Sequence, residues 1–210
     1  RDYYASRGLG DVYKRQVLVN GFVPWERKNE FKRSFAIVMG QKNQLWWDLP
    51  ASDSLYLNKC IYDVDDREYK KTVDELSELL GVRELMNIQV RRLSLGERMK
   101  MEILAALIHR PGILFLDEPT IGLDIVSQQK IRDFLHYYNE QTKTTIILTS
   151  HYMRDIEALC SRAVIINSGT LVYDGALSDI NHRMGDKRLL TLSFSLSLIH
   201  ISEPTRRVVI

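Results

Sequence analysis

The chain has 210 residues, of which 45% are hydrophobic and 27% are charged, and its formal net charge at pH 7 is +2. This composition predicts an ordinary soluble protein with a buried core, and its apolar runs are far shorter than the roughly 20 residues that a membrane-spanning helix needs. Cys60 and Cys160 are isolated from each other and from any His/Cys cluster, so we expect two buried thiols rather than a redox or metal site.

The first 16 residues contain SRGLGDVYKR, in which Gly8 and Gly10 precede Lys14. A phosphate loop requires G-x-x-x-x-G-K followed by Ser or Thr, because successive backbone N–H groups cradle the phosphates and the lysine reaches the outer ones. No Gly-Lys pair occurs anywhere in the sequence. This stretch is therefore not a phosphate loop.

The two ends of the chain are related to each other through the genetic code. Residues whose numbers sum to 212 form fifteen consecutive pairs, from Gln16 with Leu196 to Asp2 with Ile210, and every pair fits codons that are reverse complements. The two tails resemble translated transposase adapter, the DNA that is ligated to both ends of a fragment before sequencing.

We therefore expect residues 1–16 and 196–210 to be adapter-derived tails that are not native, and we exclude them from fold reasoning. The biological insert then runs from Val17 to Ser195. Without the tails the formal net charge falls by three, from +2 to −1. The insert thus gives no electrostatic hint of a nucleic-acid partner.

The front of the insert predicts two strands joined by a short polar helix. Residues 17–21 (VLVNG) indicate a strand that ends at Gly21, and residues 35–40 (FAIVMG) indicate a second strand that leads to Gln41. An amide at that place can bridge Mg²⁺ or an attacking water. The neighbouring Trp46 and Trp47 are ordinary packing residues in the simplest interpretation.

A mostly helical region follows. Residues 54–64 and 67–82 show apolar spacings of three and four, and Gly81 is a plausible stop for the second helix. A further helix begins at Ser94 in LSLGERMKMEILAALIHRP and is stopped by Pro111.

Ser94 and Glu97 have the spacing of a capping box, so a well-started helix is the simplest interpretation. The same geometry offers free N–H groups and a hydroxyl to an anion, and Gly96 would let a phosphate approach closely.

Three apolar runs lack alternation, which suits strands buried on both faces of a parallel sheet. They are residues 113–117, 144–150 and 163–167, and amphipathic segments such as residues 126–140 separate them. The back half therefore predicts an α/β fold.

Asp117 and Glu118 stand at the end of the first of these strands, where α/β sheets gather ligands. One carboxylate can hold Mg²⁺, and the adjacent one can deprotonate an attacking water. An acidic turn before Pro119 is the structural alternative. His151 follows the next strand, where it either bonds a phosphate oxygen or serves as a structural residue or helix cap.

Gln41, Ser94, Asp117, Asp124 and His151 follow one another at intervals of 53, 23, 7 and 27 residues. In this order and spacing the chain resembles the ATP-binding subunit of ABC transporters, from Val17 to about Gly175. LDEPT matches the Walker B motif, GLD the D-loop, SH the H-loop and Gln41 the Q-loop. LSLGE is similar to the signature LSGGQ, with Leu95 in place of a glycine and Glu97 in place of glutamine.

The resemblance implies a P-loop NTPase-type α/β sheet with an inserted α-helical subdomain, incomplete at its N-terminus. It implies ATP and Mg²⁺ as ligands, with Asp117 and Gln41 at the metal and Glu118 as general base. His151 would contact the γ-phosphate and Gln41 would sense it. Five further residues would bind nucleotide, the first four in trans across a head-to-tail dimer: Ser94, Leu95, Gly96, Glu97 and the D-loop residue Asp124.

The implied domain organisation follows the motifs. Residues 17–44 hold remnant strands and the Q-loop, residues 45–92 the helical subdomain, and residues 93–195 the signature, Walker B, D-loop and H-loop part of the ATPase core. WWDLP resembles the single-cassette exporter type, which implies separate membrane permease subunits and a place on the cytoplasmic face of the cell membrane. We expect no nucleic-acid partner.

Only 24 residues of the insert, Val17 to Gly40, precede Gln41, so we expect the phosphate loop, its lysine and its Mg²⁺-binding hydroxyl to have been cut away. The 210-residue chain should then not hydrolyse ATP. Two alternatives remain: a soluble ABC-type ATPase that acts on ribosomes or DNA, and a degenerate, non-catalytic ATPase-like module.

Overall fold

The computed structural model describes residues 17–179, so the expected adapter tails lie outside the described residues. The chain divides into two compact units, residues 1–161 and residues 162–210. All of the predicted site residues fall in the first unit.

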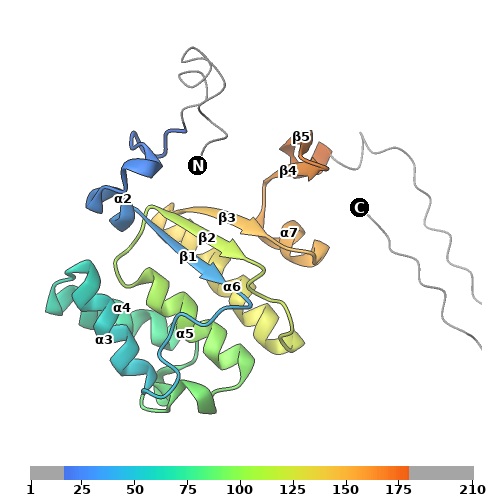
Figure 1. Cartoon of the computed structure of the whole chain (residues 1–210). Helices are drawn as coiled ribbons and strands as arrows, with labels where there is room; N and C mark the ends of the chain where they lie inside the picture. The colour runs from blue at the N-terminus through green and yellow to red at the C-terminus, as the bar shows by residue number, and fades with distance from the viewer. Residues whose placement is uncertain (1–16, 180–210) are drawn as a thin grey trace, which may run out of the picture. The chain divides into compact units, whose positions relative to one another are not determined.

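A three-stranded parallel sheet organises the first unit (Figure 1). Its strands are β1 (Phe35–Met39), β2 (Ile113–Asp117) and β3 (Thr145–Thr149), in the order β1-β2-β3. The register pairs Met39 with Asp117 and Asp117 with Thr149, so the three strands end level with one another. The predicted parallel α/β sheet is confirmed, and the chain leaves all three strands at the same edge.

Two helices contribute many of the buried residues of this unit: α5 (Leu95–Leu107) and α6 (Ile125–Thr142). Val38, Leu114 and Leu116 of the sheet are buried in one hydrophobic cluster with residues of both helices. The alternate positions point the other way: Ile37 is 38% exposed and Ile147 is 48% exposed. The prediction that residues 144–150 are buried on both faces is therefore wrong, because β3 alternates between its two faces.

The helical region contains α3 (Ala51–Tyr62) and α4 (Asp66–Leu79), followed by the short 3-10 helices η4 (Arg83–Leu85) and η5 (Val90–Arg92). Gly81 follows α4 with φ +65°, so its predicted role as a helix stop is confirmed. Both α3 and α4 pack on α5.

The segment before β1 differs from its prediction. Residues 17–21 form no strand, and the chain turns through Asn20 and Gly21, both with positive φ, to make one isolated bridge between Val19 and Phe22. The Asn-Gly turn overrides the apolar run. The short helices η3 (Pro24–Glu26) and α2 (Asn29–Arg33) follow, as the polar composition predicts.

After β3 the chain forms α7 (Met153–Leu159), which packs on α6. The described part of the second unit is an antiparallel hairpin of β4 (Arg162–Asn167) and β5 (Thr170–Ala176), followed by η6 (Leu177–Asp179). The turn residues Ser168 and Gly169 both have positive φ, as a two-residue hairpin turn demands. The prediction of a buried parallel strand at residues 163–167 is wrong, since this strand is largely exposed and its partner is the next segment of the chain.

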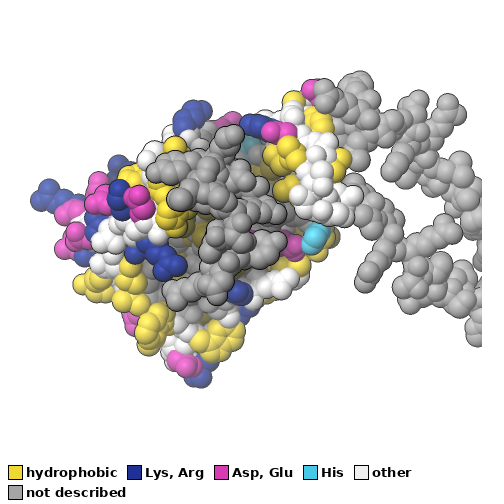
Figure 2. Space-filling view, turned by 45° about the horizontal axis from the view of Figure 1, so that its top comes forward, with side chains coloured by type: hydrophobic (Ala, Val, Ile, Leu, Met, Phe, Trp, Pro, Cys, Tyr) yellow, Lys and Arg dark blue, Asp and Glu magenta, His cyan; other side chains and the backbone are white. Residues whose placement is uncertain are grey.

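Across residues 17–179, no helix has the length and apolar character that crossing a membrane would require. The expectation of two buried thiols is wrong, because Cys60 is exposed on α3 and Cys160 is only half-buried. On the face shown in Figure 2, hydrophobic side chains reach the surface among Lys/Arg and Asp/Glu side chains that lie interspersed.

Candidate functional site

The carboxyl edge of the sheet collects the predicted acidic and histidine residues. Asp117 is the last residue of β2 and Glu118 follows it, while His151 follows β3 by two residues. Gln41 lies in the turn after β1. In an open parallel sheet this edge is where ligands bind, because the loops that leave the strands gather there.

Glu118 and His151 are in direct contact. The distance from Glu118 Oε1 to His151 Nε2 is 2.6 Å, with 21% of the Glu118 side chain and 81% of the His151 side chain exposed. Glu118 has φ +50°, a left-handed backbone conformation that residues other than glycine rarely adopt. A partly shielded carboxylate can accept a proton from a water, and an outward-facing imidazole can donate a hydrogen bond to a bound anion.

Asp117 is exposed, and one of its oxygens, Oδ1, accepts a 2.6 Å hydrogen bond from Thr149 Oγ1 on β3. Among residues 17–179 there is no group of three His, Cys, Asp or Glu that could hold a metal. A single carboxylate fits Mg²⁺ that arrives with phosphate oxygens and water, the usual arrangement for this ion, and does not fit a cage built by protein alone.

Gly40 brings the end of β1 against the turn after β2. Its N–H donates to the Asp117 carbonyl at 2.8 Å. A Cβ at this position would overlap the carbonyl oxygen of Glu118 and lie 2.9 Å from its carbonyl carbon. The close approach therefore requires glycine. Sequence reasoning missed this residue, although a glycine directly after a strand was the available signal.

The segment after Gln41 is anchored to the middle of α5. Glu102 is buried, and its Oε1 accepts the backbone N–H groups of Gln44 at 2.8 Å and Leu45 at 3.2 Å. Burial raises the pKa of the Glu102 carboxyl, and the two N–H donors oppose that rise. Gln41 itself is exposed. A charged residue inside the apolar run of α5 could have indicated a buried polar contact from the sequence, although not its partner.

Ser94 caps α5 in the predicted capping box. The Glu97 N–H donates to Ser94 Oγ at 3.3 Å, and the Ser94 N–H donates to Glu97 Oε2 at 2.9 Å. The capping interpretation is thus confirmed. Leu95, which replaces the signature glycine, is 38% exposed at the first turn.

Gly96 is buried and faces α6. A Cβ on it would overlap Ser127 Oγ and lie 2.7 Å from Ser127 Cβ. Asp124 caps α6 by accepting the Ser127 N–H at 2.8 Å, and its hydrogen bonds with Ser127 lower the pKa of its carboxyl. The structure therefore brings the Ser94 turn and the Asp124 turn together, and the missing side chain of Gly96 allows the two helices to pack.

A buried polar cluster lies behind the edge, and sequence reasoning missed it. Asp155 of α7 bonds to Arg132 of α6, to Thr120 after β2 and to Ser150 after β3. Arg132 is flanked by the buried Ile131 and lies on the apolar face of α6. A charged residue on that face was the signal in the sequence.

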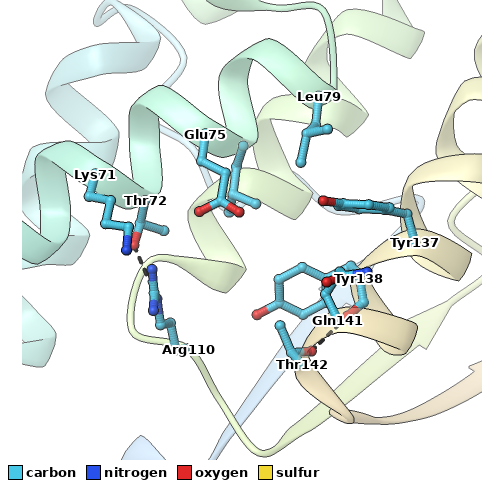
Figure 3. A pocket seen from close by; sticks show the side chains of 10 residues that line it. Lys71, Thr72, Glu75, Leu79, Arg110, Tyr137, Tyr138, Gln141 and Thr142 are labelled. Carbon is cyan, nitrogen blue, oxygen red and sulfur yellow. Dashed lines mark hydrogen bonds between the residues drawn. The ribbon is translucent and has the colours of Figure 1, made fainter.

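The structure also contains a pocket of about 250 Å³ away from this edge (Figure 3). Side chains of α4 and α6 line it, among them Thr72 and Tyr138, together with Arg110 from the turn after α5. Arg110 Nε donates to Thr72 Oγ1 at 3.2 Å, which joins the turn after α5 to α4. None of the predicted site residues lines this pocket, so the edge of the sheet is the better candidate site.

The parallel sheet, the helices on one of its faces and the acidic and histidine groups at its carboxyl edge define the class: an α/β protein whose candidate site lies where open parallel sheets bind ligands. The likeness to solved structures agrees with that class. A structure titled as the ATP binding subunit of an ABC transporter has a TM-score of 0.70 with 24% identity, covering 80% of this chain and 70% of the other. The cbiO1 structure from Clostridium perfringens has a TM-score of 0.63 with 24% identity, covering 70% and 59%.

The profile of the family described as ABC transporter matches residues 10–121, more than half of the chain. The chain therefore belongs to the ABC transporter family. The ABC transporter ATP-binding protein NatA of Bacillus subtilis is 35% identical over 164 residues, which are 78% of this chain and 66% of NatA. The linearmycin resistance ATP-binding protein LnrL of the same organism is 32% identical over 199 residues, which are 90% of this chain and 63% of LnrL. The chain thus spans just under two thirds of the length of these curated relatives.

Proposed function

We propose that the chain is part of an ATP-binding and ATP-hydrolysing subunit that energises transport by an ABC transporter. Membership of the family supports the proposal, because its members bind ATP. The observation that carries it is the 2.6 Å contact between Glu118 Oε1 and His151 Nε2, one residue beyond Asp117 at the edge of the sheet. A base, an anion-facing imidazole and a metal-binding carboxylate are the groups that phosphoryl transfer to water needs from this side of the site.

We assign the residue roles from the family resemblance, and their positions at the edge of the sheet support them. Asp117, with Gln41, would hold the Mg²⁺ that accompanies the nucleotide, and this ion would neutralise charge on the phosphates. Glu118 would take the proton from the attacking water through the carboxylate that bonds to His151. His151, which is largely exposed, would place its imidazole against the γ-phosphate.

The turns at the starts of α5 and α6 would serve a second nucleotide. In a head-to-tail dimer, four residues of this chain would face the ATP held by the partner subunit, with Asp124 beside them: Ser94, Leu95, Gly96 and Glu97. The helical region, residues 45–92, would meet separate membrane permease subunits of an exporter on the cytoplasmic face of the membrane. The exposed Trp46 and Trp47 give that region apolar surface for such a contact.

We further propose that the 210-residue chain does not hydrolyse ATP, because it has no Gly-Lys pair and hence no phosphate loop. Purified chain incubated with ATP and Mg²⁺ should release no phosphate above the level of a matched Glu118→Gln preparation. Turnover that is present in the original chain and lost in Glu118→Gln would contradict the proposal. Turnover that is equal in both preparations comes from a contaminating ATPase.

The adapter origin of residues 1–16 and 196–210 is proposed on their fifteen reverse-complement pairs. The family profile nevertheless begins at residue 10, inside the first tail. Sequencing the source locus from an independent library decides whether these residues are adapter or native. An adapter sequence will be absent there, whereas native residues will be present. The same sequence should reveal G-x-x-x-x-G-K followed by Ser or Thr upstream of Gln41.

The complete gene product then tests the activity itself. Glu118→Gln should lower its ATP turnover by about 10²-fold or more, as expected for removal of a general base. Asp133→Asn, which changes an exposed carboxylate on α6 outside the site, is the matched control and should leave turnover near the original value. Unchanged turnover in Glu118→Gln would refute the assigned role.

A further inference from the structure

The buried cluster around Asp155 contacts the loop after β2 and the loop after β3, which carry the candidate catalytic residues. The Asp155 side chain is 1% exposed, and its Oδ1 accepts a 2.7 Å bond from Arg132 Nη1, whose side chain is 8% exposed. Its Oδ2 accepts from Ser150 Oγ at 3.1 Å and also from Thr120 Oγ1. One carboxylate therefore joins α6, α7, the loop after β2 and the loop after β3.

Both loop contacts lie next to the candidate catalytic residues. Thr120 follows Glu118 by two residues, and Ser150 directly precedes His151. The strand register ends at the pair Asp117 and Thr149, and one more backbone bond, from the Glu118 N–H to the Thr149 carbonyl at 3.0 Å, continues the pairing. Beyond that bond the sheet no longer fixes the distance between the two loops, and the Asp155 side chain bridges them.

The backbone at Glu118 needs such support. Its left-handed φ of +50° is a costly conformation that persists only where the surrounding structure over-determines it. Pro119 follows and has no N–H to donate. The hydroxyl of Thr120, a residue with no exposed surface, is therefore the first side-chain anchor after the turn.

The composition of the cluster points to positioning rather than to stability alone. Burying an ion pair costs desolvation that its mutual attraction often fails to exceed, so a buried pair is weak support for stability. Arg132 is further held by Gln129, whose Oε1 accepts from Nη2 at 3.0 Å. The guanidinium thus has a fixed orientation from which it holds Asp155.

We propose that Asp155, held by Arg132, is a positioning residue that sets the approach of Glu118 to His151 through Thr120 and Ser150. The effect of this positioning on ATP hydrolysis rests on the proposed function. The contact between Glu118 and His151 that Asp155 is proposed to set does not. The geometry can therefore be tested on the 210-residue chain without nucleotide.

The experiment is NMR of the imidazole nitrogens of His151 in isotope-labelled chain. Glu118→Gln first defines the spectrum of His151 without its carboxylate partner. Thr120→Val preserves the shape of a buried side chain and removes one anchor, so the His151 Nε2 signal should move from the original position toward the Glu118→Gln position. Asp155→Asn should move it further, since it weakens every bond that Asp155 accepts.

Two variants serve as controls. Thr120→Ser keeps the hydroxyl and should restore the original His151 spectrum. Glu157→Gln changes an exposed carboxylate on the same helix, α7, and should leave that spectrum unchanged.

The proposal is overturned if Thr120→Val lowers the urea midpoint of unfolding while the His151 signal stays in place, because the cluster then acts on stability alone. It is also overturned if Glu118→Gln leaves the His151 signal unchanged. Should Asp155→Asn fail to fold, Thr120→Val decides by itself. A missing ATPase activity of the parent protein would refute the proposed function and leave this result untouched.

Discussion

Gly40 shows how a single residue without a side chain shapes the edge of the sheet. Its Cα approaches the carbonyl of Glu118 so closely that a Cβ would overlap the oxygen and meet Ile121 Cγ2 at 3.1 Å. Because the obstacle is backbone at a left-handed residue, it cannot rotate away as a side chain could. The position of Glu118 and the identity of residue 40 are therefore coupled.

We predict that Gly40→Ala destabilises the fold by about 2 kcal/mol, the usual range for forcing an extra methyl into packed structure. Urea unfolding followed by circular dichroism measures the change. Gly112→Ala is the control, because its Cβ would meet nothing closer than the Ser34 carbonyl oxygen at 3.7 Å. An equal loss in both variants would show that backbone freedom rather than overlap explains the effect.

His109, in the turn after α5, is a second residue whose surroundings set its chemistry. Its ring stacks on Tyr62 with centroids 3.8 Å apart, and its Nε2 lies 3.3 Å from the Phe35 carbonyl oxygen. Its Nδ1 is buried and has no hydrogen-bond partner within residues 17–179. Burial lowers the pKa of His109 below its usual 6.5, and the bond to Phe35 partly offsets this. The folded chain therefore resists the protonation that the unfolded chain accepts.

The direction of the pH dependence follows from this difference. Above about pH 6.5, His109 is neutral in both the folded and the unfolded chain, and its titration does not change the free energy of unfolding. Below about pH 6.5 the unfolded chain binds a proton at His109 more readily than the folded chain, so the free energy of unfolding falls. His109→Phe, which keeps an aromatic ring for Tyr62, should make the urea midpoint of unfolding less dependent on pH below about pH 6.5. His136→Asn, at an exposed histidine, should retain the slope. A slope unchanged in His109→Phe would show that another group titrates.

At the scale of elements, the starts of α5 and α6 are packed through one small residue. Gly96 meets Ser127, and Asp124 and Ser94 cap the two helices on either side of that contact. From the sequence, a capped helix start was the simplest interpretation of this stretch, and close approach of a phosphate at Gly96 was the functional alternative. In the folded chain its missing side chain also makes room for the neighbouring helix.

We predict that Gly96→Ala lowers stability by about 2 kcal/mol, since its methyl group would overlap Ser127 Oγ. Ser127→Gly removes the obstacle, so the double variant Gly96→Ala, Ser127→Gly should be more stable than the sum of the single changes predicts, by about 1 kcal/mol. A double-mutant cycle of urea unfolding free energies provides the measurement. Strict additivity would mean that the two helices do not press on each other here.

Much of this arrangement was predictable element by element. The capping box at Ser94, the helix stop at Gly81 and the buried strand before Asp117 follow from local rules, and all three are confirmed. Contacts between distant segments were not predictable, because no local pattern ties Glu102 to Gln44 or Asp155 to Thr120. A local Asn-Gly turn overrode the apolar run at residues 17–21, and pairing with the next segment of the chain overrode the prediction of a buried parallel strand at residues 163–167.

At the scale of the whole molecule, the sheet is unequally covered. The side that faces α5 and α6 is buried, whereas register pairs place Ile37, Phe115 and Ile147 in one apolar row across the opposite side. Ile37 and Ile147, at the two ends of that row, are both exposed. Parallel sheets are normally covered on both faces, so this row leaves apolar surface that favours association.

We predict that the purified chain self-associates as its concentration rises, and that the double variant Ile37→Thr, Ile147→Thr associates less. Threonine keeps the β-branched shape that strands favour while adding a hydroxyl to the surface, so each change should cost no more than about 0.5 kcal/mol of stability. Sedimentation velocity over a concentration series measures the association. Ile125→Thr, at a residue that is 75% exposed at the start of α6 and outside the row, is the control and should associate like the original chain. Equal association in all three proteins would exclude the row as the contact surface, and a reduction shared by the control would point to general surface hydrophobicity instead.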